Sequence, residues 1–231
     1  MTPSPRPQSA PIRMAHSPFA WSAIIVAGGH GSRLGTVDKS SLRFQGESLL
    51  ERAVTSTRLA RRTVVVGADD GRRVRGPALI VREEPRFAGP AFAVLAGLDH
   101  SDLGDDEVVA VLACDVPALP TILPLLLDRW AKVTATGGSI ARTDGVIGLD
   151  AQSRRQPLLS LVRVDRLRQA AATRARASDW QNASMTMLFE SLTLVPIPLA
   201  AGLARDVDTP EDARHFGIVL PERALSTSGA R

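Results

Sequence analysis

Short apolar runs that are typical of buried strands alternate along this chain with longer segments that have the apolar spacing of helices. The strand-like runs are 22–27, 63–67, 79–82, 108–113, 158–162 and 194–197. The helical segments are 47–59, 89–98, 121–130, 166–176, 185–191 and 210–216. This alternation favours a mostly parallel sheet with helices on both faces, in which ligands lie beyond the carboxyl ends of the strands. We therefore predict an α/β fold.

The folded part of the chain is predicted to be a single domain over residues 21–219. With 231 residues, 44% of them hydrophobic, the chain can build a core of that size. Residues 1–20 contain five prolines and no apolar segment, so we expect a disordered tail rather than a secretory signal. Residues 220–231 are expected to be frayed. Because every segment with a folded pattern follows Met14, we treat Met14 as a hypothetical natural start beside Met1.

The overall charge and composition limit the classes of partner. A net charge of +4 and a pI of about 10.4 would suit nucleic acid, but the basic residues are scattered. Only 4% of residues are aromatic and no tyrosine is present to stack on bases, so we expect no nucleic-acid partner. The single cysteine, Cys114, excludes an intramolecular disulfide, and no run of 18 apolar residues indicates a membrane span. We predict a cytoplasmic protein.

A glycine-rich loop, within "IIVAGGHGSRLGTVDK", follows the first predicted strand and carries two cations. Its glycines and cations are Gly28, Gly29, Gly31, Gly35, Arg33 and Lys39. In a loop with several glycines, the backbone N–H groups can turn inward and bind an anion, because glycine has no side chain in the way. Such a loop suits a nucleoside triphosphate, with Lys39 placed where charge develops as pyrophosphate leaves. The alternative is a glycine-rich turn with two solvated cations.

Two common phosphate-binding loops are excluded by their spacing. A dinucleotide-binding loop needs glycine where this chain has Leu34, and a Walker A loop needs glycine where it has Asp38. These failures disfavour a dehydrogenase and a kinase. Since the chain has 26 arginines and only two lysines, the choice of Lys39 indicates a need for its compact ammonium.

Asp115 directly follows the apolar run 108–113 and Cys114, so it is expected at the carboxyl end of a buried strand. A carboxylate there faces the ligand crevice, and Mg²⁺ is usually held by one or two carboxylates together with phosphate oxygens. The alternative is an aspartate that caps the following turn. We expect Cys114 to be a buried small residue, because no base is paired with it.

The segment "ARDVDTPED" places a second pair of carboxylates before the last predicted helix. Asp206 and Asp208 alternate along an extended stretch and so point the same way. One of them is expected to complete a metal site with Asp115. The alternative is simple helix capping by Asp208.

Several segments resemble the molybdenum cofactor guanylyltransferases, the MobA-like nucleotidyltransferases. The loop "VAGGHGSRLGTVDK" is similar to that family's L-A-G-G-x-G-x-R-M-G-x-x-K signature, with Val26 and Leu34 as conservative departures. Four further segments follow in the family's order: "FAGPAFAVLAGL", "ACDVPALP", "RRQPLLSL" and "DVDTPEDA". The resemblance covers 22–217, nearly all of the predicted domain.

This resemblance implies a Rossmann-like three-layer α/β/α fold with a mostly parallel central sheet, of the nucleotide-diphospho-sugar transferase type. It implies Mg²⁺-dependent transfer of GMP from GTP to the phosphate of molybdenum-bound molybdopterin, with a molybdoenzyme or a cofactor-delivery protein as a further partner. The implied catalytic residues are Arg33, Lys39 and Asp115. The implied nucleotide-binding residues are Ala27, Gly28, Gly29, Gly31, Ser32, Arg33, Lys39, Gly89 and Pro90. The implied metal ligands are Asp115 and Asp208, and the acceptor-binding residues are Arg155 and Gln156.

This chain departs from the family pattern at two places that bear on substrate choice. The guanylyltransferases often have asparagine where this chain has Asp206 and Asp208, and aspartates there occur in related cytidylyl and sugar nucleotidyltransferases. The pair Ala91-Phe92 replaces the family's usual leucine followed by a small residue, so we expect the wall of the nucleoside site to differ in shape. The open alternatives are a nucleotidyltransferase that uses CTP or another phosphorylated acceptor, and a non-catalytic nucleotide-binding module.

Overall fold

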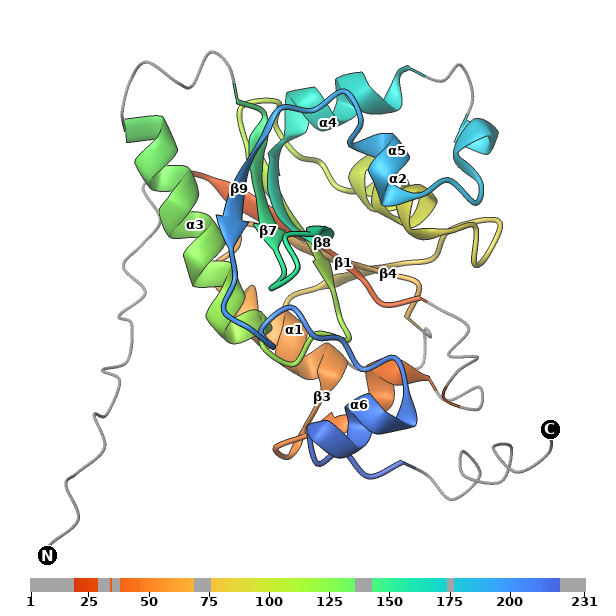
Figure 1. The fold of residues 1–231 in the computed structure, drawn as a ribbon. Helices are drawn as coiled ribbons and strands as arrows, with labels where there is room; N and C mark the ends of the chain where they lie inside the picture. Colours follow the sequence, from red (N-terminus) through yellow and green to blue (C-terminus); the bar gives the residue numbers. More distant parts are fainter. Residues whose placement is uncertain are drawn as a thin grey trace, which may run out of the picture.

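A seven-stranded sheet forms the centre of the protein in a computed structural model, which describes residues 19–28, 34, 38–68, 76–135, 143–173 and 177–220 (Figure 1). Its strand order is β5-β4-β1-β6-β8-β7-β9. The strands are β1 (Trp21–Val26), β4 (Thr63–Val66), β5 (Leu79–Val81), β6 (Val108–Ala113), β7 (Gly145–Leu149), β8 (Arg155–Arg163) and β9 (Leu194–Pro198). Within this sheet only β8 is antiparallel to its neighbours. The prediction of a mostly parallel sheet is confirmed.

Helices cover both faces of the sheet, which confirms the three-layer α/β/α arrangement (Figure 1). One face is covered by α1 (Leu49–Ser56) and α3 (Leu119–Ala135), and the other by α2 (Pro90–His100), α4 (Val164–Ala171) and α5 (Met185–Leu188). The short helix α6 (Pro210–His215) and the hairpin of β2 (Arg43–Phe44) and β3 (Glu47–Ser48) lie at one edge of these layers. Among the described residues, no helix is both long and apolar enough to cross a membrane.

The strict alternation of β1 divides its side chains between the two layers of core. Ile24 is fully buried against the α2 side, whereas Ala23 and Ile25 are buried against α1 and α3. Trp130 and Trp180 are also buried in these two clusters, one in each, where they serve as packing residues. The central strand β1 is therefore fixed on both faces, and its carboxyl end is held in place for the loop that follows.

The start of α1 lies later than the sequence predicts. Ser48 caps the helix, because its hydroxyl accepts a hydrogen bond from the N–H of Glu51 while the Glu51 carboxylate accepts from the N–H of Ser48. Residues Glu47–Ser48 instead pair with β2 as a short hairpin. A two-residue strand leaves no periodicity in the sequence, which is why the prediction began the helix at 47.

Strand β7 was not predicted, and β8 begins earlier than predicted and contains a bulge. Ile147 pairs with Ser160, but the next residue, Gly148, pairs with Gln156. Residues 157–159 of β8 therefore have no partner on β7 and form a bulge in that pairing. A bulge redirects the side chains of a strand and is common beside active sites.

Candidate active site

Lys39 is positioned by a short 3-10 turn, Lys39–Ser41, that follows the glycine-rich loop. The Asp38 carboxylate begins this turn by accepting hydrogen bonds from the backbone N–H and the hydroxyl of Ser40, at 2.9 and 2.6 Å. Leu42 and Leu49 anchor the turn in a small apolar cluster beneath α6. The Lys39 side chain is thus presented from a structured turn.

Asp115 lies where β6 ends, as predicted. The N–H of Cys114 donates to the carbonyl of Val26 at 3.0 Å, so the ends of β6 and β1 stay paired up to this point. Cys114 is buried, and burial raises the pKa of its thiol well above the usual value. The thiol stays protonated, in agreement with its expected role as a small core residue. Among the described residues, the Asp115 carboxylate does not cap the following turn, because its hydrogen bond comes from Lys39.

Asp206 and Asp208 are brought to Asp115 by the residue between them. The N–H of Val207 donates to the carbonyl of Asp115 at 2.9 Å, and the Val207 side chain is fully buried beneath α6. Its two neighbours therefore point away from that cluster. Thr209, not Asp208, caps α6, so the capping alternative for Asp208 is wrong.

One ammonium and three carboxylates meet at this edge of the sheet. Lys39 Nζ donates to Asp115 Oδ2 at 3.2 Å and also to Asp208 Oδ1. One carboxylate oxygen from each of Asp115, Asp206 and Asp208 lies within 4.8 Å of the other two. The residues come from the ends of β6 and of the glycine-rich loop and from the segment before α6, which are far apart in the sequence.

The charged groups of this cluster shift one another's pKa values. Desolvation raises the pKa of Asp115, and Lys39 offsets only part of that effect. Desolvation and the carboxylates of Asp115 and Asp208 likewise raise the pKa of Asp206. Desolvation alone would lower the pKa of Lys39, but Asp115 and Asp208 raise it. A divalent cation would relieve the repulsion among the carboxylates, and their hard oxygen atoms are the ligands that Mg²⁺ prefers, so the donor set fits this metal.

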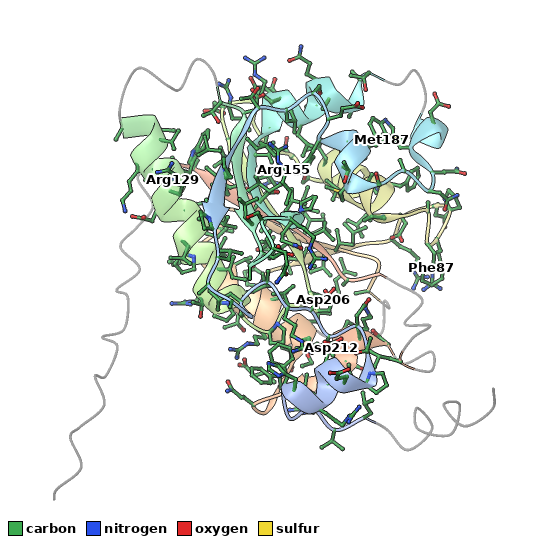
Figure 2. All side chains as sticks on the ribbon, in the orientation of Figure 1. Phe87, Arg129, Arg155, Met187, Asp206 and Asp212 are labelled. Carbon is green, nitrogen blue, oxygen red and sulfur yellow. The ribbon has the colours of Figure 1, made fainter. Side chains whose placement is uncertain are left out.

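A cavity of about 310 Å³ opens beside Asp115 and Asp206. The β8 bulge supplies much of its wall through residues 156–159, and Met185 and Thr186 from α5 supply another part. A larger cavity of about 650 Å³ lies on the other side of Asp206 and is lined by the β7–β8 turn and the segment after β9. Figure 2 labels Asp206 below the sheet and Asp212 on α6.

Glu83 is a buried carboxylate that the sequence reasoning did not single out. Only 4% of the residue is exposed, and its Oε2 accepts no hydrogen bond from the described residues. A Cβ built on Gly28 would lie 3.4 Å from Glu83 Oε1, and one built on Gly67 would lie 3.3 Å from Oε2. Glu83 therefore lies against the start of the glycine-rich loop. The signal for Glu83 in the sequence was its position just after the short strand β5. This position places an acidic residue at the same edge of the sheet as Asp115.

Residues 23–188 match the family model described as the MobA-like NTP transferase domain, which is more than half of the chain. The chain belongs to this family. The resemblance stated from the sequence is thus confirmed, and the matched region contains Lys39, Glu83 and Asp115.

Curated relatives agree with this family. A molybdenum cofactor guanylyltransferase of Cupriavidus metallidurans is 30% identical over 61% of this chain and 68% of its own length. One from Rhodopseudomonas palustris is 34% identical over 59% of this chain and 69% of its own length. One from Pseudomonas putida is 30% identical over 52% of this chain, and the match spans 62% of that relative.

Solved structures show the same fold at low sequence identity. The 2-C-methyl-D-erythritol 4-phosphate cytidylyltransferase of Thermus thermophilus has a TM-score of 0.59 and 17% identity, over 86% of this chain and 97% of that one. A nucleotidyl transferase from Methanothermobacter has a TM-score of 0.58 and 19% identity, over 85% and 97%. The fold is therefore of the nucleotide-diphospho-sugar transferase type, as the resemblance implied.

The structure brings together some of the residues that the family resemblance implied. Lys39, Asp115 and Asp208 are in contact, and Asp206 joins them as a third carboxylate. Gln156 lines both cavities, and the exposed Arg155 lines the larger one. The loop residues Gly29, Gly31, Ser32 and Arg33 lie outside the described residues.

The remaining implied nucleotide-binding residues lie on either side of this cluster. Ala27 and Gly28 follow β1 directly, and the N–H of Ala27 donates to the carbonyl of Val66 at 2.8 Å. Gly89 and Pro90 form the start of α2, and Gly89 has φ +97°. A Cβ at Gly89 would lie 3.2 Å from the Cα of Asn182, so glycine is required there by packing as well as by conformation. Neither Gly89 nor Pro90 belongs to the described lining of the two cavities.

Proposed function

We propose that this protein is a Mg²⁺-dependent nucleotidyltransferase that transfers GMP from GTP to the phosphate of molybdenum-bound molybdopterin. The observation that carries the proposal is the meeting of Lys39 with three carboxylates at the carboxyl edge of the sheet, directly after the glycine-rich loop. Membership of the MobA-like family supports the reaction class. The names of the curated relatives support GTP and molybdopterin as substrates.

In the proposed reaction an oxygen of the acceptor phosphate attacks the α-phosphorus of GTP. A new P–O bond forms, the bond between the α- and β-phosphates breaks, and pyrophosphate leaves. Asp115 and Asp208, with Asp206 beside them, would hold Mg²⁺, which neutralises phosphate charge when bound. Lys39 and Arg33 bind the outer phosphates and stabilise the charge on the leaving pyrophosphate. Because the attacking phosphate is already anionic, catalysis is mainly positioning and charge neutralisation.

Glu83 supports guanine as the base. A buried carboxylate oxygen without a hydrogen bond is costly, so a ligand that donates to it gains affinity. Guanine presents its N1–H and N2–H donors side by side, which matches a carboxylate whose Oε2 has no donor among the described residues and whose Oε1 accepts from the N–H of Phe87. Cytosine presents a single amino group beside acceptors on the same edge, and these would face the Glu83 oxygens unfavourably. Ala27, Gly28, Gly29, Gly31, Ser32, Gly89 and Pro90 complete the proposed nucleotide site.

Arg155 and Gln156 are proposed to bind the acceptor, since both line the larger cavity beyond Asp206. An arginine fork suits an anionic group of molybdopterin, and an amide suits the polar edge of its pterin. The finished cofactor would pass to a molybdoenzyme or to a delivery protein. The cytoplasmic location expected from the sequence is part of this proposal.

The nearest rival is the same reaction with CTP or with another phosphorylated acceptor. The aspartates at 206 and 208 favour it, because the guanylyltransferases often have asparagine at both positions. A direct test incubates the purified protein with Mg²⁺, each labelled nucleoside triphosphate and molybdenum-bound molybdopterin, and measures pyrophosphate release and labelled product. Product from GTP alone supports the proposal. Product from CTP supports the rival, and binding of nucleotide without any product supports a non-catalytic module.

A further inference from the structure

The two cavities beside the carboxylate cluster adjoin each other. Gln156, Ala204 and Asp206 line both of them, so the cavities meet at these residues. The smaller cavity contains Asp115, where the phosphates of the nucleotide are expected. The larger one, which we call the hairpin cavity, is about 650 Å³ and is large enough for a whole small-molecule substrate.

A single carboxylate organises the turn that lines the hairpin cavity. Asp150 follows β7, and only 9% of its side chain is exposed. Its Oδ1 accepts from the backbone N–H groups of Gln152 and Arg154, both at 2.9 Å. Its Oδ2 accepts from Arg154 Nε at 2.7 Å and from Gln156 Nε2 at 3.0 Å. Four donors therefore meet on Asp150, which uses its full capacity as an acceptor.

The contact with Asp150 fixes the orientation of the Gln156 amide. Desolvation raises the pKa of Asp150, but the hydrogen bonds from Arg154 and Gln152 outweigh it and keep the pKa below its usual value. The carboxylate is ionised at neutral pH and can only accept, so the amide atom that faces it is Nε2. The carbonyl Oε1 is consequently the end left for another partner. Among the described residues, no donor reaches it.

We propose that Asp150 is a positioning residue of the acceptor site, which holds Gln156 so that its Oε1 accepts a hydrogen bond from the acceptor substrate. This inference rests on the proposed function in taking the hairpin cavity as the place of a phosphorylated acceptor. Asp150 itself is occupied by the turn and acts only through Gln156. The β8 bulge, which begins directly after Gln156, sets this side chain between the two cavities.

The same residues define the chemical class of the acceptor. Arg155 is exposed in the hairpin cavity and has no ion pair among the described residues, so it is available to an anionic group. Gln156 Oε1 selects a molecule that offers an N–H or O–H donor. The acceptor is therefore a phosphorylated polar molecule with donors on its body, as in a pterin or a sugar, and not an apolar chain.

Binding calorimetry on the full chain tests the role of Asp150. Molybdopterin and glucose 1-phosphate serve as the pterin and sugar probes, each titrated with and without Mg²⁺ and a non-hydrolysable GTP analogue. The variants are Asp150→Ala, Gln156→Ala and the double variant. The matched control is Asp128→Ala, which removes an i,i+4 ion pair with Lys132 on α3, outside both cavities. Thermal unfolding of each variant shows whether it is folded.

The proposal predicts a pattern that a merely structural role would not give. Asp150→Ala and Gln156→Ala each weaken probe binding about tenfold, the loss expected for a hydrogen bond to a charged or oriented group. The double variant loses no more than either single variant, because both changes remove the same interaction. Affinity for the GTP analogue stays within about twofold of the wild type in every variant.

Each contrary result has a distinct meaning. The positioning role alone is overturned if the wild type and Asp150→Ala bind the probes equally tightly. It is also overturned if the losses of the two single variants add up in the double variant, or if affinity for the GTP analogue falls as much as affinity for the probes. If the wild type binds neither probe, this inference and the proposed acceptor site fall together. If probe binding follows the predicted pattern but GTP is neither bound nor used, the positioning role stands and the guanylyltransferase proposal fails. Preference for one probe identifies the pterin or the sugar as the source.

Discussion

Lys39 Nζ lies 3.2 Å from Oδ2 of Asp115, although the two residues are 76 positions apart in the sequence. Asp208 binds the same ammonium from a third part of the chain. The contact joins the turn after the glycine-rich loop to the end of β6. A cation that the chain itself provides is thus held where phosphate and metal charges are expected to meet.

Replacement of Lys39 should affect turnover far more than folding. Lys39→Ala is expected to lower kcat by about 10²–10³-fold, because a positioned cation that stabilises the leaving pyrophosphate is lost. Its melting temperature should change little, since the cluster is at the surface end of the sheet. The other lysine, Lys132, pairs with Asp128 on the exposed face of α3, so Lys132→Ala is the matched control. Steady-state kinetics with an unchanged rate for Lys39→Ala would remove this lysine from the mechanism.

The Asp206 carboxylate should lower the stability of the folded protein when no metal is bound and should contribute to the affinity for Mg²⁺. Because its folded pKa is raised, its ionised form opposes folding at neutral pH, and this penalty disappears as the pH falls through that pKa and below the unfolded value. Asp206→Asn is expected to raise the melting temperature at pH 7 without Mg²⁺ and to reduce the stabilisation that added Mg²⁺ gives. Thermal unfolding with EDTA or Mg²⁺ measures both effects. Asp102→Asn, at an exposed ion pair, is the control; a larger Mg²⁺ effect in Asp206→Asn contradicts the metal assignment.

Glu83 should decide the choice of base. Glu83→Gln keeps the shape of the side chain but replaces one acceptor oxygen with an N–H donor that would face the guanine donors. We expect GTP affinity to fall by about 10–100-fold with little change for CTP or ATP. The exposed neighbour Glu84→Gln is the control. Equal GTP affinity in both variants, measured by calorimetry, would separate Glu83 from base recognition.

Asp212 should make folding sensitive to acid. Desolvation raises its pKa, but hydrogen bonds from Thr209 and Arg205 outweigh this and lower it to about 2. A carboxyl with a lowered folded pKa contributes stability above its unfolded pKa of about 3.9, and this is lost as the pH falls towards 2. Asp212→Asn is expected to cost about 1 kcal/mol at pH 7, as for loss of a helix cap, and clearly less at pH 2, where part of the wild-type carboxyl is protonated.

Denaturant unfolding at a series of pH values measures the Asp212 effect. Glu211→Gln, on the exposed side of the same helix, is the control. A difference between Asp212→Asn and the wild type that persists unchanged at pH 2 would contradict the role of its ionised form.

The strand and helix order could be predicted because buried parallel strands leave continuous apolar runs. Strand β6 and Asp115 at its end are the clearest example. Strand β7 was missed because only five residues, two of them glycine, form it, and its partner β8 is antiparallel and bulged. Pairing of this kind is decided by distant chain segments, which no local pattern records.

The metal and lysine cluster was predictable residue by residue, but its contacts were not. Asp208 and Lys39 were singled out from motifs, whereas their direct contact depends on how Val207 is buried beneath α6. Glu83 and Asp150 were missed because their significance is tertiary. Glu83 has a buried oxygen, Oε2, that accepts no hydrogen bond from the described residues, and Asp150 holds a turn together.

This site is proposed above all to bind Mg²⁺ and to bind GTP in preference to other nucleotides. Calorimetric titration of GTP, CTP, ATP and UTP into the purified protein, with and without Mg²⁺, tests this most directly. We expect GTP to bind most tightly and this preference to require the metal. Tighter binding of CTP, or binding of GTP that is indifferent to Mg²⁺, would contradict it.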